Sequence, residues 1–297
     1  VDKTATGAAD GSSWADAFTT LQGGIDAAAV DFAAGAGAVC AEVWVADGVY
    51  DEWRYAYPHD PAINTGSLVL AEHVDVYGGF AGGEIERQQR DWHRRQTVIE
   101  GVSAREGAAA YHVVLGANDA RLDGFVVRGG IADDGTATDV NDLNCSGGGM
   151  MNQDASPIIM NCVFRNNTSA YWGGGICNLG SATPHIQYTV FVENRAQCGG
   201  GICNAYNAAP TVRGCKFLDN SAEYGGGSDD IGATASIFDA CVFAQNHAAV
   251  DCGGLRGIAG AKVSVSNSLF LGNTSGHVGG AIGFGAAHAA QVYNCTI

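Results

Sequence analysis

The stretch WGGGICN, residues Trp172–Asn178, returns 26 residues later as CGGGICN, residues Cys198–Asn204. Related phrases begin at the same interval on either side, and weaker copies follow; they start at Ser146, Tyr224, Cys252 and Val278. A glycine-rich loop can cradle a phosphate, but that motif also needs a Lys-Ser/Thr pair or a following helix. Neither follows any of these GGG runs. A phrase kept at a fixed interval instead indicates a repeat architecture in which successive units stack.

A second phrase recurs in step with the first: phenylalanine followed three residues later by asparagine. The copies FRNN, FVEN, FLDN, FAQN and FLGN begin 26 or 27 residues apart, at Phe164, Phe191, Phe217, Phe243 and Phe270. Fragments such as TVRGCKFL alternate polar with apolar or small residues at period two, which is typical of strands. Strands that return to the same place every turn pair in parallel. The sequence therefore predicts an all-β fold, a parallel β-helix whose coils of about 26 residues stack roughly 4.8 Å apart.

Each part of the repeat has a physical role in such a solenoid. A small residue stands two positions before each phenylalanine, at Cys162, Thr189, Cys215, Cys241 and Ser268. Residues two apart in a strand point to the same face, so these side chains fill the core in columns. The asparagine can hydrogen-bond to its counterpart one coil away, which gives a ladder of side-chain amides. The glycines permit a left-handed backbone at a tight corner where no Cβ fits.

The first 145 residues are less regular. Apolar residues follow at helical spacing after an N-cap candidate at Ser12 or Ser13; they are Trp14, Phe18, Leu21, Ile25, Ala28 and Phe32. An open solenoid end exposes unpaired strand edges, so we assign this helix to the role of a cap. We divide the one continuous solenoid domain into an N-terminal cap (1–40), irregular coils (41–145) and regular coils (146–297). Insertions around residues 53–66 and 131–144 are expected to be outer loops.

The composition restricts the kind of partner. The formal charge is -16 and only three residues are lysine, so nucleic acid and anionic membranes are not expected as partners. No apolar run approaches the ~20 residues of a membrane helix. The chain starts at Val1 and shows no signal peptide, so we expect a secreted protein whose leader is already removed. The ten cysteines contain no CxxC pair, and their even number is compatible with an oxidising compartment.

These phrases resemble the repeat of chlamydial polymorphic outer-membrane proteins, in which GGA[ILV] alternates with FxxN, as in GGAI at 279–282 and FLGN at 270–273. The first half is similar to secreted bacterial right-handed β-helix proteins that carry C-terminal anchor domains. The stretches VWVADGVY, VYGGFAGGE, RQQRDW and LDGFVVRGG carry that likeness. The resemblance implies a right-handed parallel β-helix at the cell surface or outside the cell, in proteins regarded mostly as adhesins or surface components. The chain stops in mid-coil at Ile297, and we expect a fragment or a lost remainder.

Three acidic residues form the best candidate for a chemical site. The fourth glycine-rich phrase replaces Cys-Asn by Asp229 and Asp230, and Asp251 follows one coil later. If stacking brings them together, they offer oxygen ligands for Ca²⁺, or the paired carboxylates of a glycoside hydrolase. The alternative is a solvated corner interrupted by Arg256. No cofactor other than Ca²⁺ is expected.

Cysteines and aromatic residues supply the remaining candidates. Cys177 and Cys203 occupy one phrase position in successive coils, and a separation of roughly 4.8 Å lies within the Cα range of a disulfide. Trp172 and Tyr224 share a corner position two coils apart, and with Trp53 they are candidates for stacking on sugar rings; partial packing is the alternative. The basic stretch RQQRDWHRR at 87–95 suits either an anionic glycan or ion pairs with the abundant acids, and we favour the ion pairs.

The sequence favours a non-catalytic extracellular or cell-surface protein. It is expected to act as an adhesin, or as a structural subunit of a surface layer or filament, and to contact glycan. Its expected partners are copies of itself, stacked end to end or laterally, and extracellular glycan. The alternative is a polysaccharide lyase or glycoside hydrolase of the β-helix type that would use Asp229, Asp230 and Asp251. Lys216 and Lys262 stand alone in the phrase register, which argues against a lyase base beside carboxylates.

Overall fold

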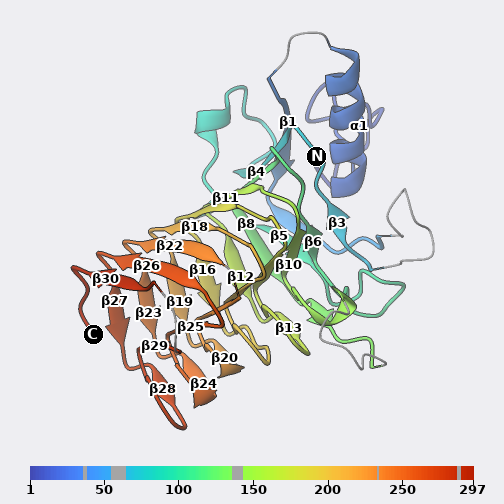
Figure 1. Cartoon of the computed structure of the whole chain (residues 1–297). Coiled ribbons are helices and arrows are strands. Elements are labelled where there is room, and N and C mark those ends of the chain that lie inside the picture. Colours follow the sequence, from blue (N-terminus) through green and yellow to red (C-terminus); the bar gives the residue numbers. More distant parts are fainter. Residues whose placement is uncertain (36–38, 55–64, 136–142, 233, 286–288) are drawn as a thin grey trace.

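The fold is a parallel β-helix of about seven coils, with roughly 27 residues in each turn and one helix at its N-terminal end. A computed structural model describes the whole chain except residues 36–38, 55–64, 136–142, 233 and 286–288. Figure 1 shows the coils stacked from the blue N-terminal helix to the red C-terminal strands. The predicted all-β solenoid and its capping helix are therefore confirmed.

Three parallel sheets run along the solenoid axis through the described residues, and each regular coil adds one strand to each sheet. The first sheet contains β1 (Ala41–Ala46), β4 (Val74–Phe80), β7 (Arg121–Asp123), β11 (Ile158–Met160), β15 (His185–Gln187), β18 (Thr211–Arg213), β22 (Ala235–Asp239), β26 (Lys262–Ser266) and β30 (Gln291–Tyr293). The second contains β3 (Leu68–Val69), β6 (Val114–Leu115), β10 (Met150–Gln153), β14 (Ile176–Leu179), β17 (Ile202–Ala205), β21 (Ser228–Ile231), β25 (Leu255–Ile258) and β29 (Ile282–Phe284).

The third sheet carries the phenylalanine column. It contains β2 (Gly48–Tyr50), β5 (Thr97–Glu100), β8 (Phe125–Arg128), β12 (Val163–Arg165), β16 (Val190–Val192), β19 (Lys216–Leu218), β23 (Val242–Ala244) and β27 (Leu269–Leu271). Short strands extend the coils beyond it: β9 (Ile131–Ala132) pairs with β13 (Thr168–Ser169), and β20 (Ser221–Tyr224) pairs with β24 (His247–Asp251), which pairs with β28 (Thr274–Ser275). Two short 3₁₀ helices, η1 (Arg87–Gln89) and η2 (Leu143–Cys145), lie in connecting segments.

The core is built from stacked identical side chains, as the repeat predicts. The phenylalanines are in register from strand to strand, and their ring centroids are 4.4–5.4 Å apart along the column from Phe164 to Phe270. Phe191, Phe217 and Phe243 are fully buried. Cys162, Cys215 and Cys241 are buried in the same core cluster.

The predicted asparagine ladder is also present. Asn167, Asn194, Asn220 and Asn246 are fully buried, and each donates its side-chain amide to the Oδ1 of the next asparagine, at 2.9–3.1 Å. The same amide groups donate to backbone carbonyls, as Asn194 does to Phe164 at 2.9 Å. Because a buried amide without a partner is destabilising, this ladder fixes the register of successive coils.

The glycine-rich phrase forms a corner of the backbone. Its first glycine has a positive φ, as at Gly173 (62°), and a Cβ on Gly174 would lie 2.5 Å from the carbonyl oxygen of Arg195. In the weaker copy Cys252 takes the first position, with a φ of 63°. The corner of each coil therefore requires a residue that can adopt a positive φ, followed by residues that have no Cβ, which explains why the glycine-rich phrase returns once per coil.

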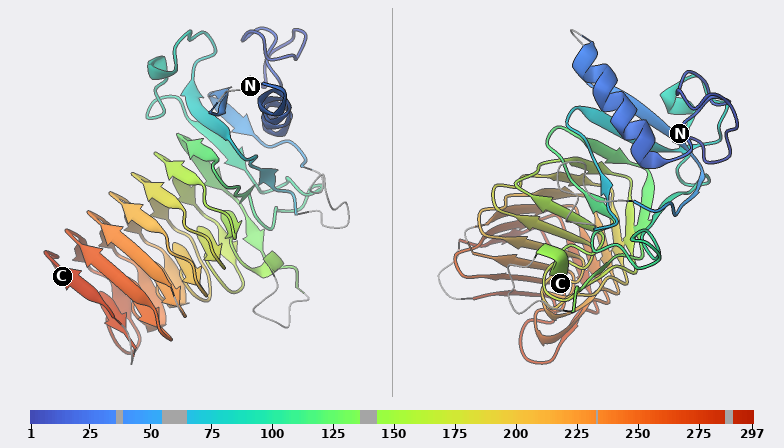
Figure 2. Two further views of the ribbon diagram at one scale, coloured as in Figure 1. Left: turned by 45° about the horizontal axis from the view of Figure 1, so that its top comes forward. Right: turned by 90° about the vertical axis from the view of Figure 1, so that its right-hand side faces the viewer.

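The capping helix α1 spans Leu21–Ala34, which corrects the predicted start. Its N-cap is Thr20, whose side chain accepts a hydrogen bond from the Gly23 N–H, and not Ser12 or Ser13. Gly24 lies inside the helix, where a Cβ would clash with a methyl group of Val1, so close packing on the solenoid end requires glycine there. Leu21 and Ile25 belong to the main core, and the helix packs on β1 and β4. Figure 2 shows it across the end of the solenoid.

The irregular coils, residues 41–145, contribute strands β1 to β8 to the three sheets. The expected outer loops at 53–66 and 131–144 fall largely on residues 55–64 and 136–142, which lie outside the described part of the chain.

Candidate functional site

The candidate site lies on the outer side of the second sheet. There, the side chains stacked in register from coil to coil change from cysteine to aspartate and then to arginine. Strand pairing places Cys177 beside Cys203, Cys203 beside Asp229, and Asp229 beside Arg256. Although this column faces away from the main core, Asp229 has no exposed surface and Arg256 is 8% exposed. Trp172, Cys198 and neighbouring apolar side chains form a second hydrophobic cluster with Cys177 and Cys203. The column therefore lies under a covering layer made by the corner segments.

Asp229 and Arg256 form a buried two-pronged ion pair. The Nε of Arg256 donates to Oδ1 at 2.8 Å, and its Nη2 donates to Oδ2 at 2.6 Å. The guanidinium also lies over the ring of Tyr224, 4.2 Å from the centroid. Burial raises the pKa of Asp229, and the hydrogen bonds from Arg256 oppose that rise. Both carboxylate oxygens are engaged by one arginine, so the pair links strands β21 and β25 of successive coils.

Asp230 points to the interior and ends a second amide ladder, which the sequence analysis did not predict. Asn152, Asn178 and Asn204 donate in turn along the ladder, at 2.8, 2.8 and 3.1 Å, and the last acceptor is Oδ1 of Asp230. The hydroxyl of Ser236 donates to the same oxygen. Burial raises the pKa of Asp230 to about 7, while these hydrogen bonds oppose the rise. Asp230 therefore acts as a terminal acceptor within the core.

Asp251 lies on a different strand from the other two aspartates. It pairs in register with Tyr224, and its carboxylate is 4.0 Å from Nδ1 of the exposed His277. Asp229, Asp230 and Asp251 thus face three different surroundings. In the described ranges, no group of three or more His, Cys, Asp or Glu side chains is placed to hold a metal ion. The expected convergence into a Ca²⁺ site or a carboxylate pair is not seen, because adjacent residues of one strand point to opposite faces.

All ten cysteines are free thiols in the structure, so it contains no Cys177–Cys203 bridge. The two are in register on β14 and β17, as expected. Directly stacked side chains of a parallel sheet point the same way, so their Cβ atoms keep roughly the strand spacing of 4.8 Å, beyond the roughly 3.8 Å mean of a disulfide. Burial raises the pKa of both thiols, which makes them poor nucleophiles.

The three aromatic candidates have different environments. Trp172 is 8% exposed and packs edge-on against Tyr206, so it is a covering residue and not an open sugar platform. Tyr224 is half-buried under the Arg256 guanidinium. Trp53 is 58% exposed. The shared column of Trp172 and Tyr224 is confirmed through Cys198, which bridges to both.

The basic stretch at 87–95 forms ion pairs, as the favoured interpretation expects. Each of its four arginines has an acidic partner: Arg87 with Glu42, Arg90 with Asp123, Arg94 with Asp91 and Arg95 with Asp47. The Arg90–Asp123 pair, at 2.8 Å, is almost fully buried. This segment therefore carries little uncompensated positive charge.

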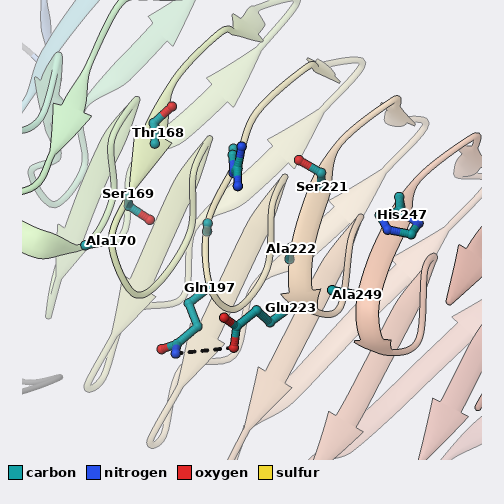
Figure 3. A pocket seen from close by; sticks show the side chains of 11 residues that line it. Thr168, Ser169, Ala170, Gln197, Ser221, Ala222, Glu223, His247 and Ala249 are labelled. Atoms are coloured by element: carbon teal, nitrogen blue, oxygen red, sulfur yellow. Dashed lines mark hydrogen bonds between the residues drawn. The ribbon is translucent and has the colours of Figure 1, made fainter. Parts of the chain in front are cut away.

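A polar groove of about 600 Å³ lies along the short strands of successive coils, shown in Figure 3. One row of its side chains is stacked in register: Thr168, Arg195, Ser221 and His247. In a second row, Gln197 donates to Glu223 at 3.4 Å, the dashed line of Figure 3. Ala196 and Ala222 lie buried between the rows.

The sequence analysis missed this groove, although its signal was available. Each residue of the first row directly follows a ladder asparagine, as Ser221 follows Asn220. Glu223 is the one carboxylate in the described lining, which also contains no Trp, Tyr or Phe. Hydrolysis of a glycosidic bond requires two carboxylates in most enzymes, and the described lining of the groove contains one.

Comparison with known proteins gives one match. Residues 161–179 match the family model described as the Chlamydia polymorphic membrane protein (Chlamydia_PMP) repeat. The matched stretch begins just before Phe164 and ends just after Asn178, so it spans both repeat phrases of one coil. No curated protein and no solved structure matches the chain. In the described residues, none of the helices has the length and apolar character needed to cross a bilayer.

Proposed function

We propose that this chain is a non-catalytic, adhesin-like protein that acts at the cell surface or outside the cell by presenting a rigid β-helix to its ligands. The observation that carries the proposal is the coil at 161–179, whose two phrases match a repeat of polymorphic membrane proteins and recur along the solenoid. Stacked side-chain columns on the outer faces, such as the row through Arg195 and Ser221, give repeated binding groups at the spacing of the coils.

The surroundings of the acidic residues support binding over catalysis. Asp229 is neutralised by Arg256, and Asp230 is enclosed in the core. Neither is accessible to a polysaccharide, and Asp251 lies apart from them. The proposed function therefore depends on the shape of the surface and on the side chains stacked along its outer faces.

Two assays on the purified chain test this proposal. Beads coated with the chain are screened against immobilised glycans and extracellular-matrix proteins, and the soluble chain is incubated with acidic and neutral polysaccharides. We expect specific adhesion and no release of sugar. Polysaccharide turnover that is abolished by Asp229→Asn together with Asp230→Asn would show a β-helix enzyme instead. A chain that neither adheres to any surface nor cleaves any substrate also contradicts the proposal.

Association of copies, end to end or laterally, remains a prediction. It is tested by light scattering of the purified chain over a range of concentrations. A mass that rises with concentration supports stacking, whereas a constant monomer mass contradicts it.

A further inference from the structure

A second hollow lies on the outer face of the third sheet, far from the Asp229–Arg256 pair in the sequence. Its floor is an apolar stripe of three valines in register, Val126, Val163 and Val190. Trp92 and Tyr188 also line the hollow. The volume of the hollow is about 380 Å³. That volume lies within the range of small-molecule pockets, roughly 300–1,000 Å³.

Trp92 is held in a fixed position. The guanidinium of Arg90 lies 4.6 Å from the centre of its ring. Arg90 is anchored in turn by its buried ion pair with Asp123, and the Asn161 amide donates to the same carboxylate at 2.8 Å. Because Arg90 is already fixed by Asp123, the Trp92 ring loses little conformational entropy when a ligand binds, which favours binding.

Tyr188 is an unusual residue for its backbone position. Its φ is 49°, in the left-handed region, yet 57% of the residue is exposed. The same corner in the other regular coils holds small or amide residues, namely Asn161, Gly214, Ala240, Asn267 and Asn294. A bulky side chain is disfavoured at positive φ, and the ring lies over Gly214 of the next coil, outside the core. The position therefore retains an aromatic ring at a strained corner beside the hollow.

The described lining of the hollow contains no lysine or arginine, and Lys216, in register with Val190 one coil later, lies beyond it. All four arginines of the basic stretch are paired with acids. The side chains of His93 and Gln96 line the hollow, and neither forms a hydrogen bond within the described residues; the same holds for the hydroxyl of Tyr188. These groups are free to bond to a ligand at the edge of an apolar floor.

We infer that this hollow binds a neutral saccharide. A sugar ring has an apolar face of C–H groups and an edge of hydroxyls, which match the valine stripe with its aromatic walls and the polar groups of His93, Gln96 and Tyr188. A carboxylated or sulfated sugar finds no lysine or arginine in the described lining, and the chain's net charge of -16 disfavours anions. This inference deepens the proposed adhesin-like function, on which it rests, by naming a ligand class and its place on the fold.

The binding test uses the purified chain and a defined panel. Glucose, galactose, mannose, N-acetylglucosamine, cellobiose and lactose are titrated at millimolar concentration, with galacturonic acid as the anionic comparison. Saturation-transfer NMR and the tryptophan fluorescence report binding. We expect at least one neutral sugar to bind, and galacturonic acid to bind more weakly.

Variants taken from the chain's own repeats locate the site. Tyr188→Asn introduces the residue found at the same corner in other coils, and Val190→Lys introduces the residue found one coil later at Lys216. Both variants should fold, because the equivalent positions of other coils already hold Asn and Lys. Each should weaken sugar binding about tenfold or more. The matched control is Tyr206→Asn, an exposed tyrosine with a φ of 63° outside the hollow, which should leave binding unchanged.

Each remaining outcome contradicts the inference. It fails if Tyr188→Asn and Val190→Lys bind sugar as the unmodified chain does, if Tyr206→Asn weakens binding equally, if only galacturonic acid binds, or if no sugar in the panel binds. Bead adhesion that persists in any of these cases leaves the adhesin-like function intact. Loss of both sugar binding and bead adhesion in the unmodified chain contradicts both proposals.

Discussion

The phenylalanine column and the column through Asp229 cross the same coils but have opposite compositions. From Phe164 to Phe270 the first repeats one side chain, with rings 4.4–5.4 Å apart. The second changes at every step beyond Cys203, to Asp229, then Arg256, then Gly283. Apolar rings gain contact by stacking on copies of themselves, whereas buried carboxylates at that spacing would repel one another.

The difference shows how a solenoid accommodates charge. Asp229 is matched by a cation one coil away, and Arg256 donates to both of its carboxylate oxygens, whereas Asp230 is satisfied by the neutral donors Asn204 and Ser236. Identity along a column therefore marks an apolar or amide position, and a break in identity marks a position where one coil depends on the next.

The largest effect is expected from removing the cation alone. Arg256→Met leaves the Asp229 carboxylate buried without its cationic partner and should reduce the free energy of unfolding by about 3–5 kcal/mol. Denaturant titration with circular dichroism measures it. The double variant Asp229→Met/Arg256→Met restores an apolar column and should recover most of the loss. If the single variant is as stable as the unmodified chain, the column does not depend on this pair.

A second test uses the acid that ends the interior ladder. The pKa of Asp230 is raised to about 7, so between pH 4 and pH 7 the unfolded chain releases a proton that the folded chain keeps. Stability should therefore fall as pH rises through this window, by at most roughly 4 kcal/mol. Asp230→Asn continues the asparagine ladder and should remove that part of the pH dependence, making the variant the more stable form at pH 8. Parallel stability–pH curves for the two chains would contradict this assignment.

A smaller loss is expected within a column of identical residues. Asn194→Ala leaves the Asn167 amide and its neighbours short of a buried partner, and should destabilise the fold by about 1–3 kcal/mol. Thermal unfolding measures the change. Asn207→Ala, at an exposed asparagine outside the ladder whose φ is not positive, is the control and should have little effect. Equal losses in the two variants would mean that burial in the ladder is unimportant.

The smallest effect concerns the thiols. Because no disulfide links the coils, adding a reductant should leave the melting temperature unchanged, and the denatured chain should show ten reactive thiols without prior reduction. A thiol-reactive dye measures both states of the chain. A lower thiol count together with a melting temperature that falls on reduction would show that the cysteine columns are bridged.

The repeated positions were the predictable part of the molecule. Phe217, Asn220 and Gly173 each recur at one interval, and their roles as core, ladder and corner follow from that recurrence. Trp172 was harder to place: its phrase position located it at a corner, but only the packing of Tyr206 shows that it is covered. Thr20 replaced Ser13 as the N-cap because the docking of Leu21 and Ile25 on the solenoid end selects where the helix starts.

The sequence by itself determined the solenoid, its period and the residues that stack, because identical side chains at a constant interval can be satisfied together only by coils that lie one above another. Tertiary structure alone decided which face of a coil each non-repeating residue takes and what covers it. Asp229 and Asp230 are neighbours in the chain, yet one meets Arg256 outside the sheet and the other meets Asn204 inside it. Successive strand residues point to opposite faces, so their environments depend on segments a full coil or more away.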